Sequence, residues 1–320
     1  MEKLKLAVII AVFILFLYLI SPLLDGVVMG IAFAYVAKPI HEKLRIRLRE
    51  PFSAFISTTI IAIPIFFFFF YGIFQGITQL VFILSNYDIV DLLNKYIGTS
   101  KLVSTLINQA ITFISNKIGD LAVKITTRFI FFIMNFAISI VVCFYIIADG
   151  KRVAEKAINL FKSEELKTFF IEIDKTLTGL WFGNFIAALL IGLASIPYFL
   201  IFEVPYASLL SGLMFLAALI PVFAEWMVIL PVAFYLYFVD PIKALWFTVI
   251  GAVFFYIIPE LILRPQFVGY TSKIHPLLLL LSFIGGGIVA GVTGFFLTPM
   301  LAATLSAVYN HFVKYTQTEL

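Results

Sequence analysis

The sequence predicts an all-α integral membrane protein with about eight transmembrane crossings, and composition is the first reason. Of the 320 residues, 62% are hydrophobic and only 12% are charged, and the mean hydropathy is +1.10. A soluble domain carries about 25% charged residues. This chain therefore has too little polar surface for a water-facing particle, and its surplus apolar surface must face the lipid bilayer. The second reason is that apolar stretches recur near the roughly 20 residues that a spanning helix needs.

The first half of the chain, residues 1–150, is expected to hold four crossings and to serve as a scaffold or oligomerisation region. Within it, residues 86–125 place apolar side chains at three- and four-residue spacing, which is typical of an amphipathic helix. We expect this segment at the outer membrane surface. The run Phe66–Phe70 covers every side of its helix and is expected to face lipid, a partner subunit, or both. The crossings are predicted at about 4–20, 22–37, 52–82 and 128–148.

The second half is expected to begin with a cytoplasmic amphipathic helix at 151–178, followed by a transport region at 179–312. Ser163 can cap a helix, and the acidic residues after it favour the positive N-terminal end of that helix. Residues 313–320 are expected to form a cytoplasmic tail. Crossings of the transport region are predicted at about 179–202, 205–223, 226–239 and 244–263, with a split pair at 276–312.

Lysine and arginine are distributed unevenly between the connecting segments, and this predicts the orientation. Basic residues concentrate in the segments 38–49 and 149–178, which an N-terminus on the cytoplasmic side would place inside. Cytoplasmic loops carry an excess of positive charge. We therefore expect a multi-pass protein of the cell membrane with both termini in the cytoplasm.

Two segments of the second half share an outline that suggests broken helical hairpins. Residues 205–239 and 276–312 each open with proline, continue through leucines and a serine, and are then interrupted. On the predicted orientation they enter from opposite sides, which is the inverted repeat that builds many secondary transporters. The alternative is that proline and glycine only kink ordinary helices, and re-entrant and fully spanning forms both remain open. The expected interruptions contain Pro221 in the first segment and Gly285, Gly286 and Gly287 in the second.

Charged and polar residues at membrane depth are the candidate solute or ion contacts, because burying a charge there costs on the order of 3 kcal/mol. Glu225 lies in the first interruption. Glu260 and Arg264 have the spacing of an ion pair on one helix face, or of a structural cap. Asn184 could join helices or touch solute. His275 could titrate near neutral pH or simply mark the interface.

Several function classes lack their sequence signatures. The chain has no Walker A loop, no His-Glu-x-x-His pair and no Gly-x-Ser-x-Gly elbow. We therefore expect no enzyme activity, no cofactor and no bound metal. The net charge of +4 comes from basic residues at membrane edges and predicts no nucleic-acid binding.

The second half also resembles a known family. The stretches EVPYASLLSGLMFLAALIPVFAEWMVILPVAFYL and LILRPQFVGYTSKIHPLLLLLSFIGGGIVAGVTGFFLTPMLAA are similar to segments of the autoinducer-2 exporter family of transporters. The resemblance covers roughly residues 170–312, and the N-terminal half agrees in layout. The matching positions are Leu263-Arg264-Pro265, Gly269, His275-Pro276, Leu281-Ser282, Gly285-Gly286, Gly291, Gly294 and Pro299.

This resemblance implies a secondary transporter that moves a small solute or ion by alternating access. It also implies a homo-oligomer, a pentamer, with an elevator-like mobile part. Two departures bear on the cargo: Glu260-Leu261 stands where the family commonly has Asp-Asn, and Glu225 stands where an apolar or small residue is usual. The extra carboxylate favours a sodium or lithium/proton antiporter as one alternative. A non-transporting membrane scaffold is the alternative from another class.

Overall fold

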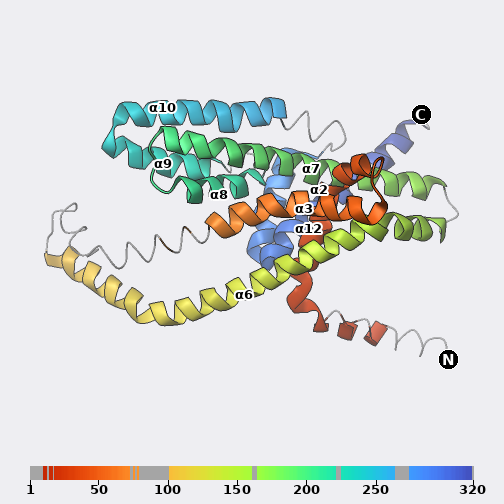
Figure 1. Ribbon diagram of the computed structural model, residues 1–320, viewed down its shortest axis with the longest axis horizontal. Helices are drawn as coiled ribbons and strands as arrows, with labels where there is room; N and C mark the ends of the chain where they lie inside the picture. The colour runs from red at the N-terminus through yellow and green to blue at the C-terminus, as the bar shows by residue number, and fades with distance from the viewer. Residues whose placement is uncertain are drawn as a thin grey trace.

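A computed structural model describes residues 10–12, 14–16, 18–72, 75, 78, 101–160, 164–220, 225–263 and 274–318. This part of the chain is almost entirely helical and holds no strand, which confirms the expected fold class. Figure 1 shows α7, α8, α9 and α10 running lengthwise beside one another, with α3 next to α8, α6 on the far side of α3, and α2 and α12 crossing these helices. The helices are α2 (Leu24–Leu44), α3 (Glu50–Phe66), α6 (Lys101–Leu160), α7 (Glu164–Ile201), α8 (Ala207–Ala218), α9 (Trp226–Val239), α10 (Pro241–Ala252) and α12 (Pro276–Thr318).

Short irregular helical segments extend three of these helices. A 3₁₀ turn at Ser21–Leu23 leads into α2, and a π-helical turn at Phe67–Tyr71 continues α3. Two further π-helical turns, Val253–Ile257 and Pro259–Leu263, continue α10. Within the described ranges, six helices are long and apolar enough to cross a membrane, while α8 and α9 are shorter.

Both segments that we expected at the membrane surface are continuous with crossings in the described part of the chain. Residues 101–125 of the expected outer segment form the first part of α6, a single helix of 60 residues. The expected cytoplasmic helix at 151–178 is divided: residues 151–160 form the end of α6, and residues 164–178 run directly into the next crossing as α7. Residues 86–100 of the outer segment lie outside the described part of the chain, as does most of the crossing expected at 4–20.

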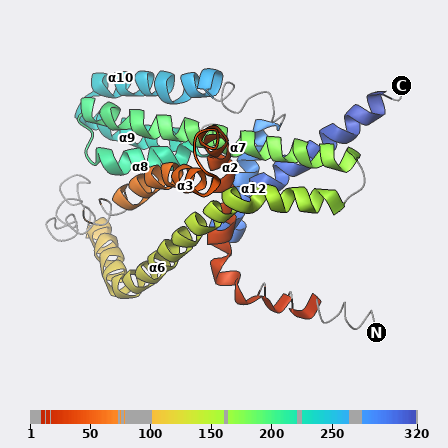
Figure 2. The ribbon, with the colours of Figure 1, turned by 45° about the vertical axis from the view of Figure 1, so that its right-hand side comes forward.

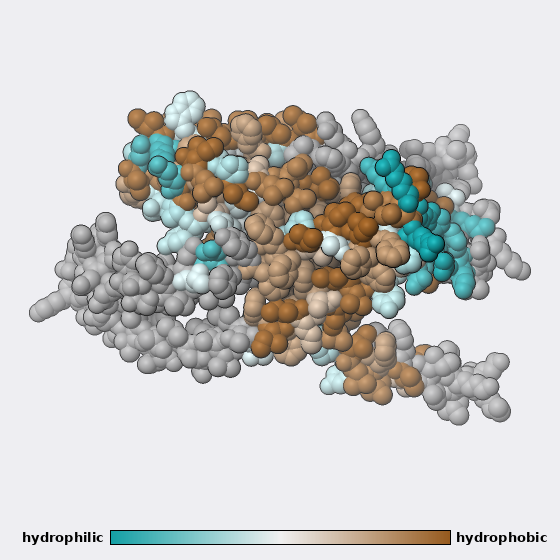
Figure 3. All heavy atoms as spheres, in the orientation of Figure 1, coloured by the Kyte–Doolittle hydropathy of each residue, from teal (hydrophilic) through white to brown (hydrophobic). Residues whose placement is uncertain are grey.

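Polar residues gather at the two ends of the molecule and leave an apolar middle (Figure 3). At one end, Lys38 of α2 pairs with Asp174 of α7. At the opposite end of α7, Lys243 Nζ lies 2.6 Å from Glu203 Oε2. The α7 segment from Asp174 to Ile201 is about 40 Å long at 1.5 Å per residue, which matches a bilayer core of about 30 Å plus part of its interfaces.

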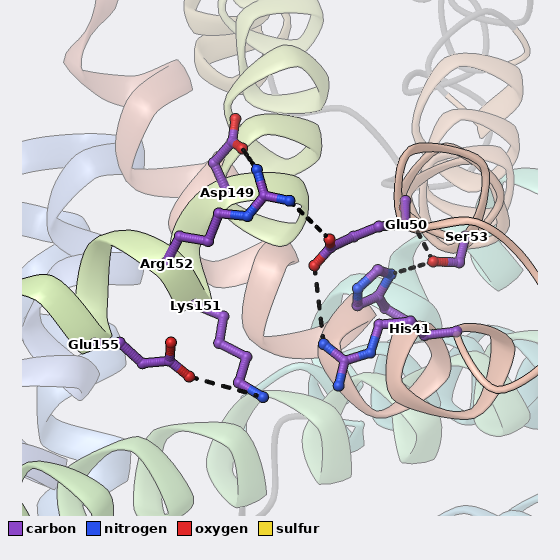
Figure 4. A network of polar contacts seen from close by, with 8 residues as sticks. His41, Glu50, Ser53, Asp149, Lys151, Arg152 and Glu155 are labelled. Carbon is purple, nitrogen blue, oxygen red and sulfur yellow. Dashed lines mark hydrogen bonds and ion pairs between the residues drawn. The ribbon is translucent and has the colours of Figure 1, made fainter.

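The basic segments that predicted the orientation meet in one polar network (Figure 4). Glu50, at the start of α3, lies 3.2 Å from Arg152 of α6 and 3.9 Å from Arg45. Ser53 contacts the Nδ1 atom of His41 at 2.9 Å. The α2–α3 connection and the α6–α7 region therefore occupy the same end, as the predicted orientation requires.

The start of α2 is bound closely to α6. The Asn135 side chain accepts a hydrogen bond from Gly26 N at 2.8 Å and donates to Pro22 O at 3.0 Å. A Cβ atom at Gly26 would lie 2.5 Å from the Asn135 carbonyl oxygen, and one at Gly30 would lie 2.6 Å from Val142 Cβ. Only glycine allows this separation of the helix axes.

The segment α8–α9 forms a hairpin whose two ends lie at the same end of the molecule. Glu203 precedes α8 and Lys243 follows α9, and their ion pair joins the two ends. With 12 and 14 residues, α8 and α9 are each about 18 to 21 Å long. Each is too short to cross a bilayer core of about 30 Å alone. The chain therefore enters and leaves this hairpin at one end of the molecule, through arms shorter than the six apolar helices that are long enough to span a membrane.

A second hairpin is formed by the two arms of α12. The backbone leaves the helical conformation at Ala290 (φ −135°, ψ 24°) and Gly291 (φ 57°, ψ −134°). This corrects the expectation that Gly285, Gly286 and Gly287 form the break, because those residues are helical. Gly286 instead permits contact between the arms, since a Cβ there would lie 2.2 Å from the Gly294 carbonyl oxygen.

A helix followed by a hairpin occurs twice in the second half of the chain, first as α7 with α8–α9 and then as α10 with the two arms of α12. The α10 helix carries the chain away from the Glu203–Lys243 end before α12 begins (Figure 1). The C-terminal end of α12 lies on the same side of the molecule as the end of α6 and the start of α7, as Figure 2 also shows.

Candidate functional site

The interruptions of both hairpins border one cavity of about 670 Å³. Leu219 and Ile220, at the end of α8, and Met227 and Val228, at the start of α9, form one part of its wall. Gly287, Gly291 and Val292 of α12 form another part. The first half of the chain closes the remaining side through residues of α2, α3, the π-helical turn after α3, and α6: Met29, Phe33, Val36, Ile65, Phe69, Phe132 and Phe136.

Aromatic rings dominate the wall of this cavity. Trp181 of α7 stacks on Phe296 of α12 with ring centroids 5.2 Å apart, and Phe33 of α2 meets Phe296 edge-on at 6.0 Å. Phe185, one helical turn after Trp181, contacts Phe215 of α8 edge-on at 6.1 Å. Such pairs add about 0.5–1.5 kcal/mol each beyond area burial. The rings therefore fix the positions of α2, α7, α8 and α12 around the cavity.

The lining of the cavity is apolar. Every residue that borders it within the described ranges is aliphatic, aromatic, methionine or glycine. The one polar atom on a lining side chain is the indole nitrogen of Trp181, a residue that is 2% exposed. This Nε1 has no hydrogen-bond acceptor among the described residues. The described wall therefore offers a large apolar volume, and the buried indole nitrogen of Trp181 does not open into it.

A carboxylate from the first half holds the second arm of α12 beside the cavity. Asp25 Oδ1 accepts hydrogen bonds from Thr293 N at 2.9 Å and from Thr293 Oγ1 at 2.6 Å. Thr293 lies in the first turn after the break, where amide groups have no helical partner. A negative charge at this end of a helix is also favourable. Asp25 thus caps the second arm and joins it to α2.

The predicted site residues take different places relative to the cavity. Glu225 is 1% exposed and stands between the lining residues Ile220 and Met227 in the chain. Asn184 is 3% exposed and precedes the lining residue Phe185. Neither is itself a lining residue.

The other predicted residues are more scattered. Gly287 lines the cavity, Gly286 lies between the arms of α12, and a Cβ at Gly285 would meet open space. Glu260 is half-buried in the π-helical turn Pro259–Leu263, and His275 is exposed at the start of α12. Pro221 and Arg264 lie outside the described residues.

Asp25, Thr293 and Asn135 were missed by the sequence analysis. Asp25 and Asn135 are isolated polar residues within apolar stretches, at 22–37 and 128–148. Glu225 was singled out as a polar or charged residue within an apolar stretch, and both residues meet the same criterion. Thr293 gave no comparable signal, because a threonine hydroxyl in a membrane helix commonly bonds to its own backbone.

The described residues hold no cluster of three or more metal-ligating side chains. Among the described residues, those that line the cavity include no nucleophile and base pair. What the described arrangement can do is bind a molecule between α2, α3 and α6 on one side and α7, α8, α9 and α12 on the other.

Comparison with known proteins agrees with this architecture. The sequence model of the family described as AI-2E family transporter matches residues 7–314 of this chain. A protein of Archaeoglobus fulgidus named "Putative transport protein" is 47% identical over 317 residues, which is 96% of this chain and 93% of that protein. A protein of Methanocaldococcus jannaschii with the same description is 25% identical over 94% of both chains.

A more distant relative comes from Bacillus subtilis and is also named as a putative transport protein. It is 28% identical over 177 residues, which is 54% of this chain and 47% of that protein. The match to the family extends over both halves, beyond the region in which the sequence resemblance was specific. The chain belongs to the AI-2E family of membrane transporters.

Proposed function

We propose that this protein is a secondary transporter that moves a small solute across the cell membrane by alternating access through the aromatic cavity. The observation that carries the proposal is the convergence of both helix interruptions on that cavity. Broken helices at membrane depth are tolerated where they border protein or a cavity. In transporters with inverted repeats, such breaks form the solute site near the middle of the membrane.

The hairpins would form the moving wall, and the first half would form the fixed one. The Asp25–Thr293 hydrogen bonds join the second arm of α12 to α2, and they would have to break when the cavity opens to the other side. The proposed division at residue 150 gives the N-terminal region the fixed role and residues 179–312 the mobile role. An N-terminus in the cytoplasm follows the distribution of basic residues.

Thiol labelling tests alternating access without knowledge of the cargo. In a Cys143→Ser background, single cysteines would replace the lining residues Leu219 and Val292. A charged thiol reagent that does not cross lipid would then be added to right-side-out or inside-out vesicles. We expect both cysteines to be labelled from each side. Protection from both sides would support the non-transporting scaffold instead. Cysteine at exposed Ala154 is the control for reagent activity.

A sodium or lithium/proton antiporter is the second candidate, favoured by one observation. Glu225 is a carboxylate that is 1% exposed at the start of α9, in a part of the molecule where a charge is expensive. In proteoliposomes, an antiporter would dissipate an imposed sodium gradient with counterflow of protons. Glu225→Gln should then abolish the exchange. Equal exchange by the wild type and by this variant would remove Glu225 from the coupling role.

A further inference from the structure

We infer that the connection between α2 and α3, residues 45–49, is a binding site for the phosphate groups of anionic phospholipids. The connection has the sequence Arg-Ile-Arg-Leu-Arg, so three of its five side chains carry a guanidinium group. The inference concerns an interaction surface at the edge of the membrane. It is independent of the proposed transport function, because the binding of a lipid requires no movement of solute.

The flanking helices fix this connection at the surface of the bilayer. Ser21–Leu44 and Glu50–Phe70 are both long and apolar enough to span a membrane, and residues 45–49 join them. Five residues reach at most about 18 Å even when fully extended. A chain that leaves one spanning helix and enters the next within this length stays at the membrane surface. The three arginines therefore lie at the depth of the lipid head groups.

The positive charge of the connection is only partly balanced within the described part of the chain. Arg45 lies 3.9 Å from Glu50, which is also paired with an arginine of α6 (Figure 4). Arg47 and Arg49 are exposed and form no ion pair among the described residues. Glu42, an exposed acid on the last turn of α2, pairs with none of them in the described structure. The two free arginines therefore attract an anion from outside the chain.

Exposed apolar side chains lie next to these cations, and they favour a lipid over a soluble phosphate. Ile46 and Leu48 alternate with the arginines and are 84% and 39% exposed. Phe52 and Phe55, in the first two turns of α3, are each 62% exposed. The acyl chains of a lipid would cover such side chains, whereas a phosphate ion would not. Basic residues combined with exposed apolar ones are typical of segments that bind the interface of anionic membranes.

Arginine suits the phosphate group of a lipid in its geometry as well as its charge. A guanidinium group donates two parallel hydrogen bonds to phosphate oxygens, which lysine does not do. Arg49 is also the residue that precedes α3, and the start of this helix has no side-chain cap. A phosphate held by Arg49 would stand beside the positive end of the helix dipole.

Lipid titration followed by native mass spectrometry tests the site. The purified protein in detergent, freed of lipid, would be titrated with phosphatidylglycerol or with phosphatidylcholine of the same acyl chains. One basic side chain near an anionic lipid surface contributes about fivefold in affinity. We expect the first phosphatidylglycerol to bind at least about fivefold more tightly than phosphatidylcholine. Arg47→Gln combined with Arg49→Gln should reduce this ratio to below about twofold.

A charge-matched control separates this site from a general attraction of lipid to basic protein. Arg128→Gln combined with Lys156→Gln removes the same charge from two exposed positions, near the two ends of the α6 span. This control should keep the wild-type ratio, and an equal fall would show that diffuse charge attracts the lipid. If the double variant of the connection does not fold, Arg47→Gln or Arg49→Gln alone should lower the ratio at least about twofold.

Two further results would overturn the inference. One is equal affinity of the wild type for the two lipids. The other is displacement of bound phosphatidylglycerol by an equal concentration of glycerol 3-phosphate, which would identify a soluble phosphate as the ligand. Neither result bears on the thiol-labelling test, so the transport proposal and the lipid site can fail separately.

Discussion

Two neighbouring glycines in the first arm of α12 should respond in opposite ways to the same substitution. Gly286 faces the second arm, and an added Cβ would lie 2.2 Å from the Gly294 carbonyl oxygen and 2.5 Å from Thr298 Oγ1. A carbon–oxygen contact is normally at least about 3.3 Å, so the arms would have to separate by about 1 Å. At Gly285 an added Cβ meets no atom within 4 Å.

The free-energy difference follows from these contacts. Overpacking costs about 1–3 kcal/mol, and Gly286→Ala should lie near the upper end because its nearest obstacle is backbone that cannot change rotamer. Gly285→Ala should instead stabilise the helix by about 0.5–1 kcal/mol, since alanine is the better helix former. The two variants should therefore differ by roughly 3 kcal/mol in unfolding free energy.

Thermal unfolding in detergent, followed by the helical circular dichroism signal, compares the two variants directly. Gly286→Ala should melt below the wild type and Gly285→Ala at or above it. Gly294→Ala should behave like Gly286→Ala, because its Cβ would clash with the Gly286 carbonyl oxygen. If Gly286→Ala is as stable as Gly285→Ala, the arms do not pack as described.

The remaining predictions concern polar contacts and charges. Thr293→Val removes the hydrogen bond from Oγ1 to Asp25 while keeping the side-chain shape. It should lower the free energy of unfolding by about 1.5–3 kcal/mol, as expected for a hydrogen bond to a charged group. A double-mutant cycle with Asp25→Asn should show coupling, and additive losses of stability would contradict the contact. Gly26→Ala should lower the melting temperature, because its Cβ would lie 2.5 Å from the Asn135 carbonyl oxygen, and an unchanged value would argue against close α2–α6 packing. Lys243 lowers the pKa of Glu203 from its ordinary 4.5 through a hydrogen bond and its positive charge. A carboxylate whose pKa is lower in the folded state stabilises the fold fully above its ordinary pKa, and this stabilisation is lost as the pH falls through the folded-state pKa. The wild type should therefore be more stable than Glu203→Gln at neutral pH, and the difference should shrink below pH 4.5. A stability difference that does not depend on pH would refute the pairing. Arg152→Gln removes an exposed ion pair and should lower the free energy of unfolding by less than about 1 kcal/mol, and this difference should vanish in high salt. A larger loss of stability that salt does not change would show that the network is essential to the fold.

The class of fold could be predicted from the sequence because membrane helices are specified by local composition. Apolar length predicted the six described helices that are long enough to cross a membrane. The distribution of lysine and arginine predicted that the α2–α3 connection and the end of α6 lie together, and Arg152 does contact Glu50. The positions of glycine and proline likewise predicted two interrupted hairpins. The exact break in α12 was misplaced, since three consecutive glycines signal close approach as well as interruption. Here Gly286 allows the two arms of α12 to pack closely, and Gly291 adopts the positive φ at the break.

The cavity could not be predicted, because its wall is made of residues that look the same as lipid-facing ones. The run Phe66–Phe70 was expected to face lipid or a partner subunit, yet Phe68 is 4% exposed and stacks on Phe215. Phe69, its neighbour, borders the cavity. In a membrane protein hydrophobicity does not distinguish interior from exterior, so only tertiary packing separates these roles. Among the charged candidates, Glu225 was singled out because a buried charge is expensive, and it stands next to the lining residues in the chain without lining the cavity itself.

The length of α6 exceeds what one membrane crossing needs. Its 60 residues contain about 90 Å of helix, roughly three times the thickness of the bilayer core. The helix bends along its length (Figure 2), and its residues Thr127–Lys156 form the apolar span. Near its C-terminal end, Arg152 contacts Glu50 of α3. The polar residues that precede the span are therefore joined to it by helical backbone and not by a loop, so a change in their position acts directly on the span.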